Sequence, residues 1–455
     1  MANEFKYVRL AAALGCAAVG LGFGSTAQAV VVVGGDNGWE VSFDGNINAF
    51  YVNGSYDRGW NPFGLNAPDA AGGFHSATQP NSRDVARVTS GFLPAFFSFN
   101  VKSPTVDGIY ATARFSFAPT IQNGNDKNQL YAATSPGGNG IQGSSIDTRE
   151  VLVNINGPFG VMSFGRTLSL FGRNAILKDM TLFGVGISNV NGGSVTAGRI
   201  GRGYTYPNFN ARISYKTPVM AGFQAEVGLY DPSVEENNAL SGVGILDQTD
   251  TPRFEGELSF TQPFSGGGFQ FWVDGLWQSI QSTAALGGSV DVGGWGVGTD
   301  VKWMGFDVTG YYYGGQGLGR SLQFNSGTAC NLVAVGTRSM GSICDAAEDS
   351  GYYLQGTYTF NGVTKVGVSY GESSEDHMGP NLVNPATNLL STGLPNQDVK
   401  LSMWTVGVYH DVNSWLKLIA EYSSARNAFD RPLGQPTGSG TTGSDTFSIG
   451  SFFIW

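Results

Sequence analysis

The chain lacks the long apolar runs with which helical proteins cross a membrane. Beyond residue 29, its 455 residues contain no stretch of 18 consecutive apolar side chains, and a spanning helix needs about 20. Charge is also scarce, since only 13% of the residues are charged and the net charge is −10. This acidic balance argues against nucleic acid as a partner. Glycine (68 residues) and aromatic residues (13%) are abundant instead.

Cysteine is nearly absent. Of the three cysteines, Cys16 lies in the apolar N-terminal region, and only Cys330 and Cys344 lie in the rest of the chain. These two enclose thirteen residues within the expected connection 314–350, so in an oxidising compartment they predict a disulfide that fixes an external loop. A metal site would need histidines or further cysteines nearby, and this segment has none. We expect neither a metal nor a cofactor.

The N-terminus has the pattern of a signal peptide. Lys6 and Arg9 precede an apolar, small-residue stretch over 10–24, and Ala27-Gln28-Ala29 has the small-x-small form of a cleavage site. A buried N-terminal helix is the alternative, but the stretch is rich in glycine. We therefore expect residues 1–29 to be removed and residues 30–455 to form a single domain outside the cytoplasm.

Apolar residues recur with a period of two along much of the chain. Ile109, Ala111, Ala113, Phe115 and Phe117, for example, alternate with polar or small residues, which indicates a strand with two different faces. A closed sheet pairs every backbone group and can therefore cross lipid, with its apolar face outward and its polar face towards a water-filled lumen. A soluble array of β-sandwiches is the alternative, but no repeat of domain length is present.

Sixteen such segments can be placed, most of them about as long as a tilted membrane-spanning strand. They lie near 39–53, 86–102, 107–119, 146–156, 160–167, 205–217, 222–231, 252–262, 268–281, 291–303, 305–313, 351–361, 362–371, 399–411, 415–425 and 444–455. Long and short connections alternate between them, as in outer-membrane barrels with periplasmic turns. The sequence therefore predicts an all-β fold, a 16-stranded antiparallel transmembrane β-barrel with both termini in the periplasm. Alternation breaks at 91–94 and 149–150.

The last strand ends on aromatic residues. Phe447, Ile449, Phe453 and Trp455 recur at alternate positions, which suits the interfacial aromatic belt of a barrel in lipid. This segment resembles the terminal strand of Gram-negative outer-membrane porins, in which a final aromatic residue helps the assembly machinery to recognise the chain. Trp455 is the residue that the resemblance implies for this role.

The centre of the chain carries a more specific resemblance. Phe164-Gly165-Arg166-Thr167 ends one segment, a long connection follows, and Ala211-Arg212-Ile213-Ser214-Tyr215-Lys216-Thr217-Pro218 begins the next. General porins are similar here, and their long third loop folds into the lumen and narrows it. The resemblance implies a homotrimer in the bacterial outer membrane, in contact with its lipids, that lets small hydrophilic solutes and ions diffuse passively. The chain lacks the Pro-Glu-Phe-Gly-Gly of many relatives and has Leu182-Phe183-Gly184 in its place.

The resemblance also implies which side chains line the constriction. Arg114 and Arg166 would form a basic wall, and Asp179 would be the facing acid. Arg199, Arg202 and Arg212 also lie on the lumen side of the pattern or in the third loop. Since arginine stays protonated in proteins, each is a durable pore charge, although each could equally be paired or solvated inside a wet barrel. The sequence does not decide between anions and cations.

Two other functions stay open. A barrel selective for sugars or organic acids would use aromatic residues such as Tyr204, Tyr206, Tyr311 and Tyr313 to stack on ring-shaped substrates. An outer-membrane lipid hydrolase would need a Ser–His pair. The histidines at 75, 377 and 410 lie in no recognisable nucleophile motif, so we expect the protein not to be an enzyme.

Overall fold

The computed structural model describes residues 30–34, 37–57, 60, 83–121, 146–188, 195–232, 246–282, 289–319, 328–335, 339–376, 383–384, 389–390, 398–430 and 440–455. Strands dominate these residues, and the two helical elements, α1 (Arg173–Lys178) and the 3₁₀ helix η2 (Met180–Phe183), are short. No helix within the described ranges is long and apolar enough to span a membrane.

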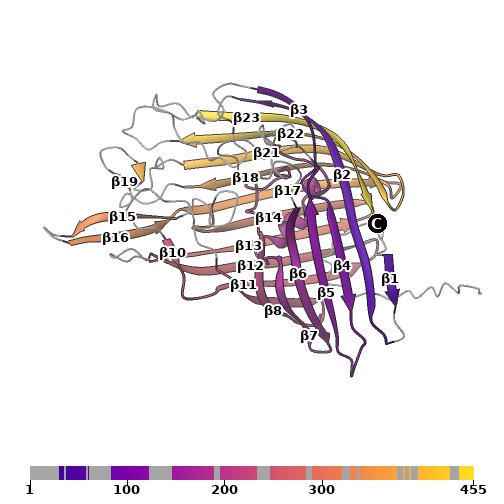
Figure 1. Cartoon of the computed structure of the whole chain (residues 1–455). Coiled ribbons are helices and arrows are strands. Elements are labelled where there is room, and N and C mark those ends of the chain that lie inside the picture. The colour runs from indigo at the N-terminus through magenta and orange to yellow at the C-terminus, as the bar shows by residue number, and fades with distance from the viewer. Residues whose placement is uncertain are drawn as a thin grey trace, which may run out of the picture.

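The strands form one closed antiparallel barrel (Figure 1). Its sheet holds 19 strands. Two of these, β1 (Val30–Gly34) and β10 (Leu246–Gln248), are short additions, and β3 and β4 are two parts of one wall strand, which leaves a wall of sixteen. The wall strands are β2 (Glu40–Tyr56), β3 with β4 (Arg83–Thr89 and Phe96–Lys102), β5 (Tyr110–Pro119), β6 (Ile146–Gly157), β7 (Gly160–Leu168), β8 (Phe209–Lys216), β9 (Phe223–Tyr230), β11 (Arg253–Phe264), β12 (Gly267–Ser282), β13 (Ser289–Trp303), β14 (Phe306–Gln316), β17 (Glu348–Phe360), β18 (Thr364–Glu375), β21 (Asp398–Asp411), β22 (Leu416–Asp430) and β23 (Gly440–Ile454).

The first and last wall strands close the barrel. β2 pairs with β23 from Asn46 opposite Ile454 to Tyr56 opposite Ser444. Each of the sixteen predicted segments corresponds to one wall strand, so the sequence-based fold is confirmed. Outside the wall, β15 (Thr328–Val335) and β16 (Ser339–Ala346) form a hairpin that extends beyond the neighbouring strands in Figure 1, and β19 (Val383–Asn384) pairs with β20 (Leu389–Leu390).

The alternation of the strands sorts residues between the two faces of the wall. In β21, Trp404, Val406 and Val408 are exposed on the outside, whereas Met403 and Thr405 are buried inside. The polar or covered face thus points inward and the apolar face points outward, as lipid requires.

Tyrosine and tryptophan are unevenly distributed on the outer face. Seven consecutive wall strands, β12, β13, β14, β17, β18, β21 and β22, each expose at least one of them. Strand pairing places several of these aromatic residues at a similar height on the barrel wall, because Tyr312 lies opposite Tyr352 and Tyr370 lies opposite Trp404. We call these residues the aromatic belt: Trp277, Trp295, Tyr312, Tyr352, Tyr370, Trp404 and Tyr422. From β3 to β7, the large exposed apolar residues of the described chain include no tyrosine or tryptophan.

The predicted break at 91–94 is a real interruption of the second wall strand. β3 and β4 both pair with β2, and the chain between them turns into the lumen. There the Gly91 N–H donates to Asn48 Oδ1 at 2.8 Å, and the Phe92 N–H donates to the Gly184 carbonyl of the third loop at 2.8 Å. The second predicted break is a bulge, because the register of β5 and β6 shifts near Arg149.

Candidate pore constriction

The described residues of the connection between β7 and β8, 169–188 and 195–208, fold into the barrel and follow its inner wall. We call this connection the third loop. Its first anchor is Glu255 on β11, whose Oε2 accepts the N–H groups of Leu170 at 2.7 Å and Phe171 at 3.0 Å. Glu255 is buried, so these hydrogen bonds lie away from water and are strengthened by the low local dielectric.

A second carboxylate holds the far part of the loop. Glu421 Oε2 on β22 accepts the N–H groups of Val185 at 2.7 Å and Gly186 at 3.0 Å, and Glu421 Oε1 accepts the Tyr409 hydroxyl. A side chain at Gly184 would collide with this carboxylate, so the glycine permits the close approach of loop and wall. The Leu182-Phe183-Gly184 segment that departs from the family pattern is thus the attachment point of the loop.

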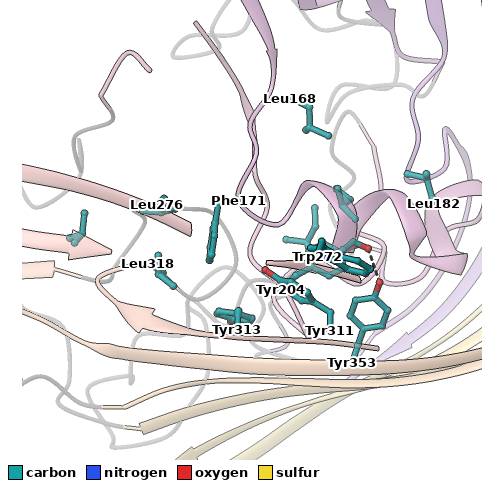
Figure 2. Packing of buried hydrophobic residues seen from close by; sticks show 14 of the residues in the cluster. Leu168, Phe171, Leu182, Tyr204, Trp272, Leu276, Tyr311, Tyr313, Leu318 and Tyr353 are labelled. Atoms are coloured by element: carbon teal, nitrogen blue, oxygen red, sulfur yellow. Dashed lines mark hydrogen bonds between the residues drawn. The ribbon is translucent and has the colours of Figure 1, made fainter. Parts of the chain in front are cut away.

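The middle of the loop is attached by polar groups of β17. The Tyr353 hydroxyl donates to the Ala175 carbonyl at 2.9 Å, and Gln355 bridges the Lys178 carbonyl and the Met180 N–H, both at 2.7 Å. Around these bonds an apolar core fills the space between loop and wall (Figure 2), which includes Trp272 at 0% exposure. The loop therefore lies in the lumen beside β9 to β23 and touches β6 and β8 through Arg149 and Asn210. A gap remains beside β4 and β5, where Arg114 is partly exposed.

Three predicted constriction residues of the loop are buried. Asp179 caps η2, accepts the Thr181 N–H at 3.0 Å and the Tyr204 hydroxyl at 2.7 Å, and lies 3.7 Å from Arg199. Arg199 and Arg202 are both 0% exposed. Arg199 donates to the Met403 carbonyl at 3.2 Å, and Arg202 donates to Asn427 at 2.7 Å and lies over the Trp60 ring. These three side chains thus attach the loop to the wall and do not face an open pore.

Burial also shifts the acidities of the loop. The pKa of Tyr204 is raised well above its usual value, first by burial and then by the charge of Asp179. The pKa of Arg202 is lowered by burial and by the neighbouring Arg199 guanidinium. Both shifts are consistent with groups that water does not reach.

The other predicted arginines divide between the two faces of the wall. Arg212 is buried on the inside, where it pairs with Glu226 at 3.1 Å and lies over the Tyr230 ring. Arg166, in contrast, lies opposite Ala211 on the outward face and is exposed beside Phe164. The expectation that Arg166 faces the lumen therefore disagrees with the strand register.

Arg114 is the predicted constriction residue that the structure places on the open lumen wall. Its guanidinium donates to Asp44 at 2.8 Å and to Glu150 at 2.7 Å, and also binds Asn100 and Ser98. The Arg114 side chain is 33% exposed, and that of Asp44 is 27% exposed. This cluster faces the gap that the third loop leaves.

Sequence analysis missed the side chains on the partly exposed face of α1. On α1, Arg173, Asn174, Leu177 and Lys178 are partly exposed, whereas the opposite face is buried. Arg173 pairs with Glu226 at 2.9 Å and Glu257 at 3.0 Å, and Lys178 pairs with Asp300 at 3.2 Å. The spacing of the four residues, i, i+1, i+4 and i+5, is that of one helix face and was the available signal.

The remaining predicted sites are sparsely described. Cys330 lies directly opposite Cys344 in the β15–β16 register. His75 and His377 lie outside the described residues, and His410 Nδ1 shares a 2.8 Å hydrogen bond with Thr364. No group of three histidine, cysteine or acidic residues in the described part of the chain is placed to hold a metal ion.

A closed barrel with a loop folded into its lumen defines the class of channel-forming outer-membrane proteins. A family model described as Gram-negative porin matches residues 10–430, so the chain belongs to that family. It is a porin, located in the outer membrane, and forms a channel for passive diffusion.

Solved structures support the fold. The outer-membrane channel DcaP of Acinetobacter baumannii aligns with a TM-score of 0.59 and 14% identity, covering 94% of this chain and 100% of the other. The anion-selective porin from Comamonas acidovorans aligns with a TM-score of 0.53 and 15% identity, covering 92% and 100%. The comparison with curated protein sequences gave no match.

Proposed function

We propose that this porin is a general diffusion channel that favours small anions. The supporting observation is the charge of the third loop. Its single acidic residue, Asp179, is buried against Arg199, whereas Arg173 and Lys178 lie on the partly exposed face of α1. Fixed cations beside a narrow aqueous path attract anions and repel cations.

The ion pairs of the third loop also support the proposed anion preference. The Lys178 side chain is 18% exposed and its partner Asp300 only 6%. Arg173 is likewise more exposed than either of its two carboxylate partners. The Lys178–Asp300 pair therefore presents its cation to the lumen more than its acid. The structurally similar porin from Comamonas acidovorans is described as anion-selective, which agrees with this reading.

Selectivity for sugars is less well supported. Tyr204, Tyr311 and Tyr313, which a sugar ring would need to contact, are at most 4% exposed and are packed between the third loop and the wall. Stacking requires an accessible ring face. A general channel therefore fits the lumen better than a substrate-selective one. A channel also needs no catalytic activity.

The reversal potential in a potassium chloride gradient tests the anion preference. We expect the unmodified channel in planar bilayers to favour chloride, and Lys178→Gln to shift the reversal potential towards potassium. Lys400→Gln is the matched control, because Lys400 also pairs with an acid, Glu372 at 3.2 Å, but on the outer face of β21. A potential that is unchanged by Lys178→Gln, or that favours potassium in the unmodified channel, would contradict the proposal.

We further infer that the channel is a homotrimer whose contact includes the β3 to β7 face. Arg166 is exposed there beside Phe164, and an arginine that faces hydrocarbon costs about 2–4 kcal/mol near the bilayer centre. A second copy on this face would remove the charge from lipid. We expect an unheated sample to migrate as a trimer in mild detergent, and Arg166→Gln to change the temperature at which it dissociates. Migration at monomer mass alone would contradict this.

Processing and export complete the proposal. We propose that residues 1–29 are a signal peptide, that residues 30–455 are the mature barrel, and that Trp455 takes part in recognition by the assembly machinery. We also propose a Cys330–Cys344 disulfide, because residues directly opposite in an antiparallel pair lie about 4.5–5.5 Å apart between Cα atoms, within disulfide range. Intact mass before and after reduction tests both the cleavage site and the disulfide.

A further inference from the structure

The outer wall has a groove of about 640 Å³ that lies mainly across β8, β9, β11 and β12 and ends at Met162 of β7 and Gly294 of β13. Along one side runs a row of exposed apolar residues on these four strands, held opposite one another by the register: Ile213, Leu229, Phe254 and Trp277. Along the other side, Tyr215 pairs with Val227, and Gly256 pairs with Gly275. Because neighbouring strands lie about 4.8 Å apart, the groove is roughly 14 Å long.

The glycine pair gives the groove its depth. Gly256 and Gly275 both lie at outward positions, between the inward-facing Glu255, Asp274 and their neighbours. With no side chains there, the floor is bare backbone, and the next outward residues, Leu258 and Val273, lie one pair further along. The result is a hollow in an otherwise convex wall, bordered by the rings of Phe254 and Trp277, whose centroids lie 6.0 Å apart.

The position of the groove identifies the material that covers it. Trp277 belongs to the aromatic belt, and the adjacent strands β13 and β14 continue the belt with Trp295 and Tyr312. Tryptophan and tyrosine at one level of a barrel wall mark the boundary between headgroups and hydrocarbon. The groove therefore opens in the part of the wall that faces lipid, and its lining is almost wholly apolar.

We propose that this groove binds one acyl chain of a bilayer lipid, with the lipid headgroup at the level of Trp277 and the chain over Gly256 and Gly275. The apolar floor and walls offer no partner for a polar ligand. The size fits a single hydrocarbon chain, since ligand sites commonly measure about 300–1,000 Å³. A flat or convex wall would hold a chain less well, because fewer of its methylene groups would be in contact.

A glycine replacement tests the site without changing the lumen. A Cβ at Gly256 would meet its nearest atoms at 3.8 Å, an ordinary contact, so Gly256→Leu fills the groove from the outside. Gly356 on β17 is the matched control, because it lies outside the groove and a Cβ there meets nothing within 4 Å. Single-channel conductance should be the same for the unmodified protein, Gly256→Leu and Gly356→Leu, which shows that all three are folded.

Native mass spectrometry after reconstitution in dimyristoylphosphatidylcholine measures the bound lipid. We expect the unmodified protein and Gly356→Leu to retain a lipid on each chain, and Gly256→Leu to retain it roughly tenfold less, the effect of losing contact with about two methylene groups. Equal retention by the three proteins would overturn the proposal. Loss of oligomers in Gly256→Leu with lipid retention unchanged would also overturn it, because the groove would then be a contact between copies.

Discussion

The two halves of the barrel wall are built in opposite ways. From β12 to β22, each strand exposes a tyrosine or tryptophan outside, while inside the third loop covers the wall and buries residues such as Trp272 and Tyr353. From β3 to β7, the exposed large apolar residues of the described chain include neither tyrosine nor tryptophan, while inside, Arg114 remains in contact with water beside Asp44 of β2. We call these two parts of the wall the belted half and the unbelted half.

This difference fits the proposed trimer, in which one wall would serve two partners. A belt is useful where the wall meets lipid headgroups, and the unbelted half would then meet the neighbouring copies. On the inside, a loop held by buried carboxylates needs an apolar surface on which to pack, which the belted half supplies. On the unbelted half, the partly exposed Arg114 and Asp44 pair reaches the aqueous path.

Removal of a loop anchor should have the largest effect. Glu421→Ala leaves the N–H groups of Val185 and Gly186 and the Tyr409 hydroxyl without their acceptor, at about 1–3 kcal/mol for each buried group left unsatisfied. We expect a lower unfolding temperature and a noisier, altered conductance. Glu421→Gln keeps an acceptor oxygen and should restore most of both properties. Equal unfolding temperatures for the alanine variant and the unmodified protein would show that the stability of the belted half does not depend on this anchor.

A bulky residue should distinguish the two outer faces. Ala113 on β5 and Ala420 on β22 both lie at outward positions, in the unbelted and the belted half respectively. Ala113→Trp should break up the oligomer on a mild detergent gel, since a protein contact is close-packed and tolerates added volume poorly. Ala420→Trp should have no such effect because lipid adapts to the ring. The comparison of the halves fails if both variants keep, or both lose, the oligomer.

Changes in the unbelted half should alter ion preference more than the stability of the fold. Arg114→Gln would leave Asp44 and Glu150 without their common cation, so we expect the reversal potential to move towards cations, with the unfolding temperature little changed. Arg114→Lys keeps the charge and should retain most of the original preference. A shift of the same size in both variants would mean that side-chain shape, and not charge, sets the preference at this wall.

Loss of one belt residue should have the smallest effect. Trp295 is 54% exposed, and its ring contacts Tyr312. Trp295→Leu keeps an apolar side chain at the site, and surface changes of this kind usually alter stability by no more than about 0.5 kcal/mol. Unfolding in lipid vesicles measures the change. A large loss of stability would mean that each ring of the aromatic belt contributes strongly on its own.

The fold could be predicted almost completely from the sequence because its signal is local. Outward residues such as Phe115 and Phe117 alternate with inward ones, and this pattern fixes strand, face and boundary together. Even the two breaks in the pattern were informative, since one is the inward turn at 91–94 and the other the bulge near Arg149. Conformations of this kind follow from neighbouring residues alone.

The constriction could be predicted only in part, because the side chains of a loop do not alternate between two faces as those of a strand do. Arg199 and Arg202 became buried through contacts with β21 and β22, more than 200 positions away in the sequence. Asp179 carried a local signal, since an acid two residues before a threonine often caps a turn. For Arg166, alternation with Met162 and Phe164 indicated the outer face, and the family resemblance overrode that indication.

The interruption of the second wall strand affects how the barrel opens. Among the described residues, β3 pairs with β2 alone, whereas β4 pairs with both β2 and β5. Within the described residues, β3 is thus paired with one wall strand, and a strand held from one side exchanges its amide hydrogens more readily than a strand held from both. We expect hydrogen–deuterium exchange to begin at β3. The barrel would then have a second point of opening, separate from the β2–β23 closure.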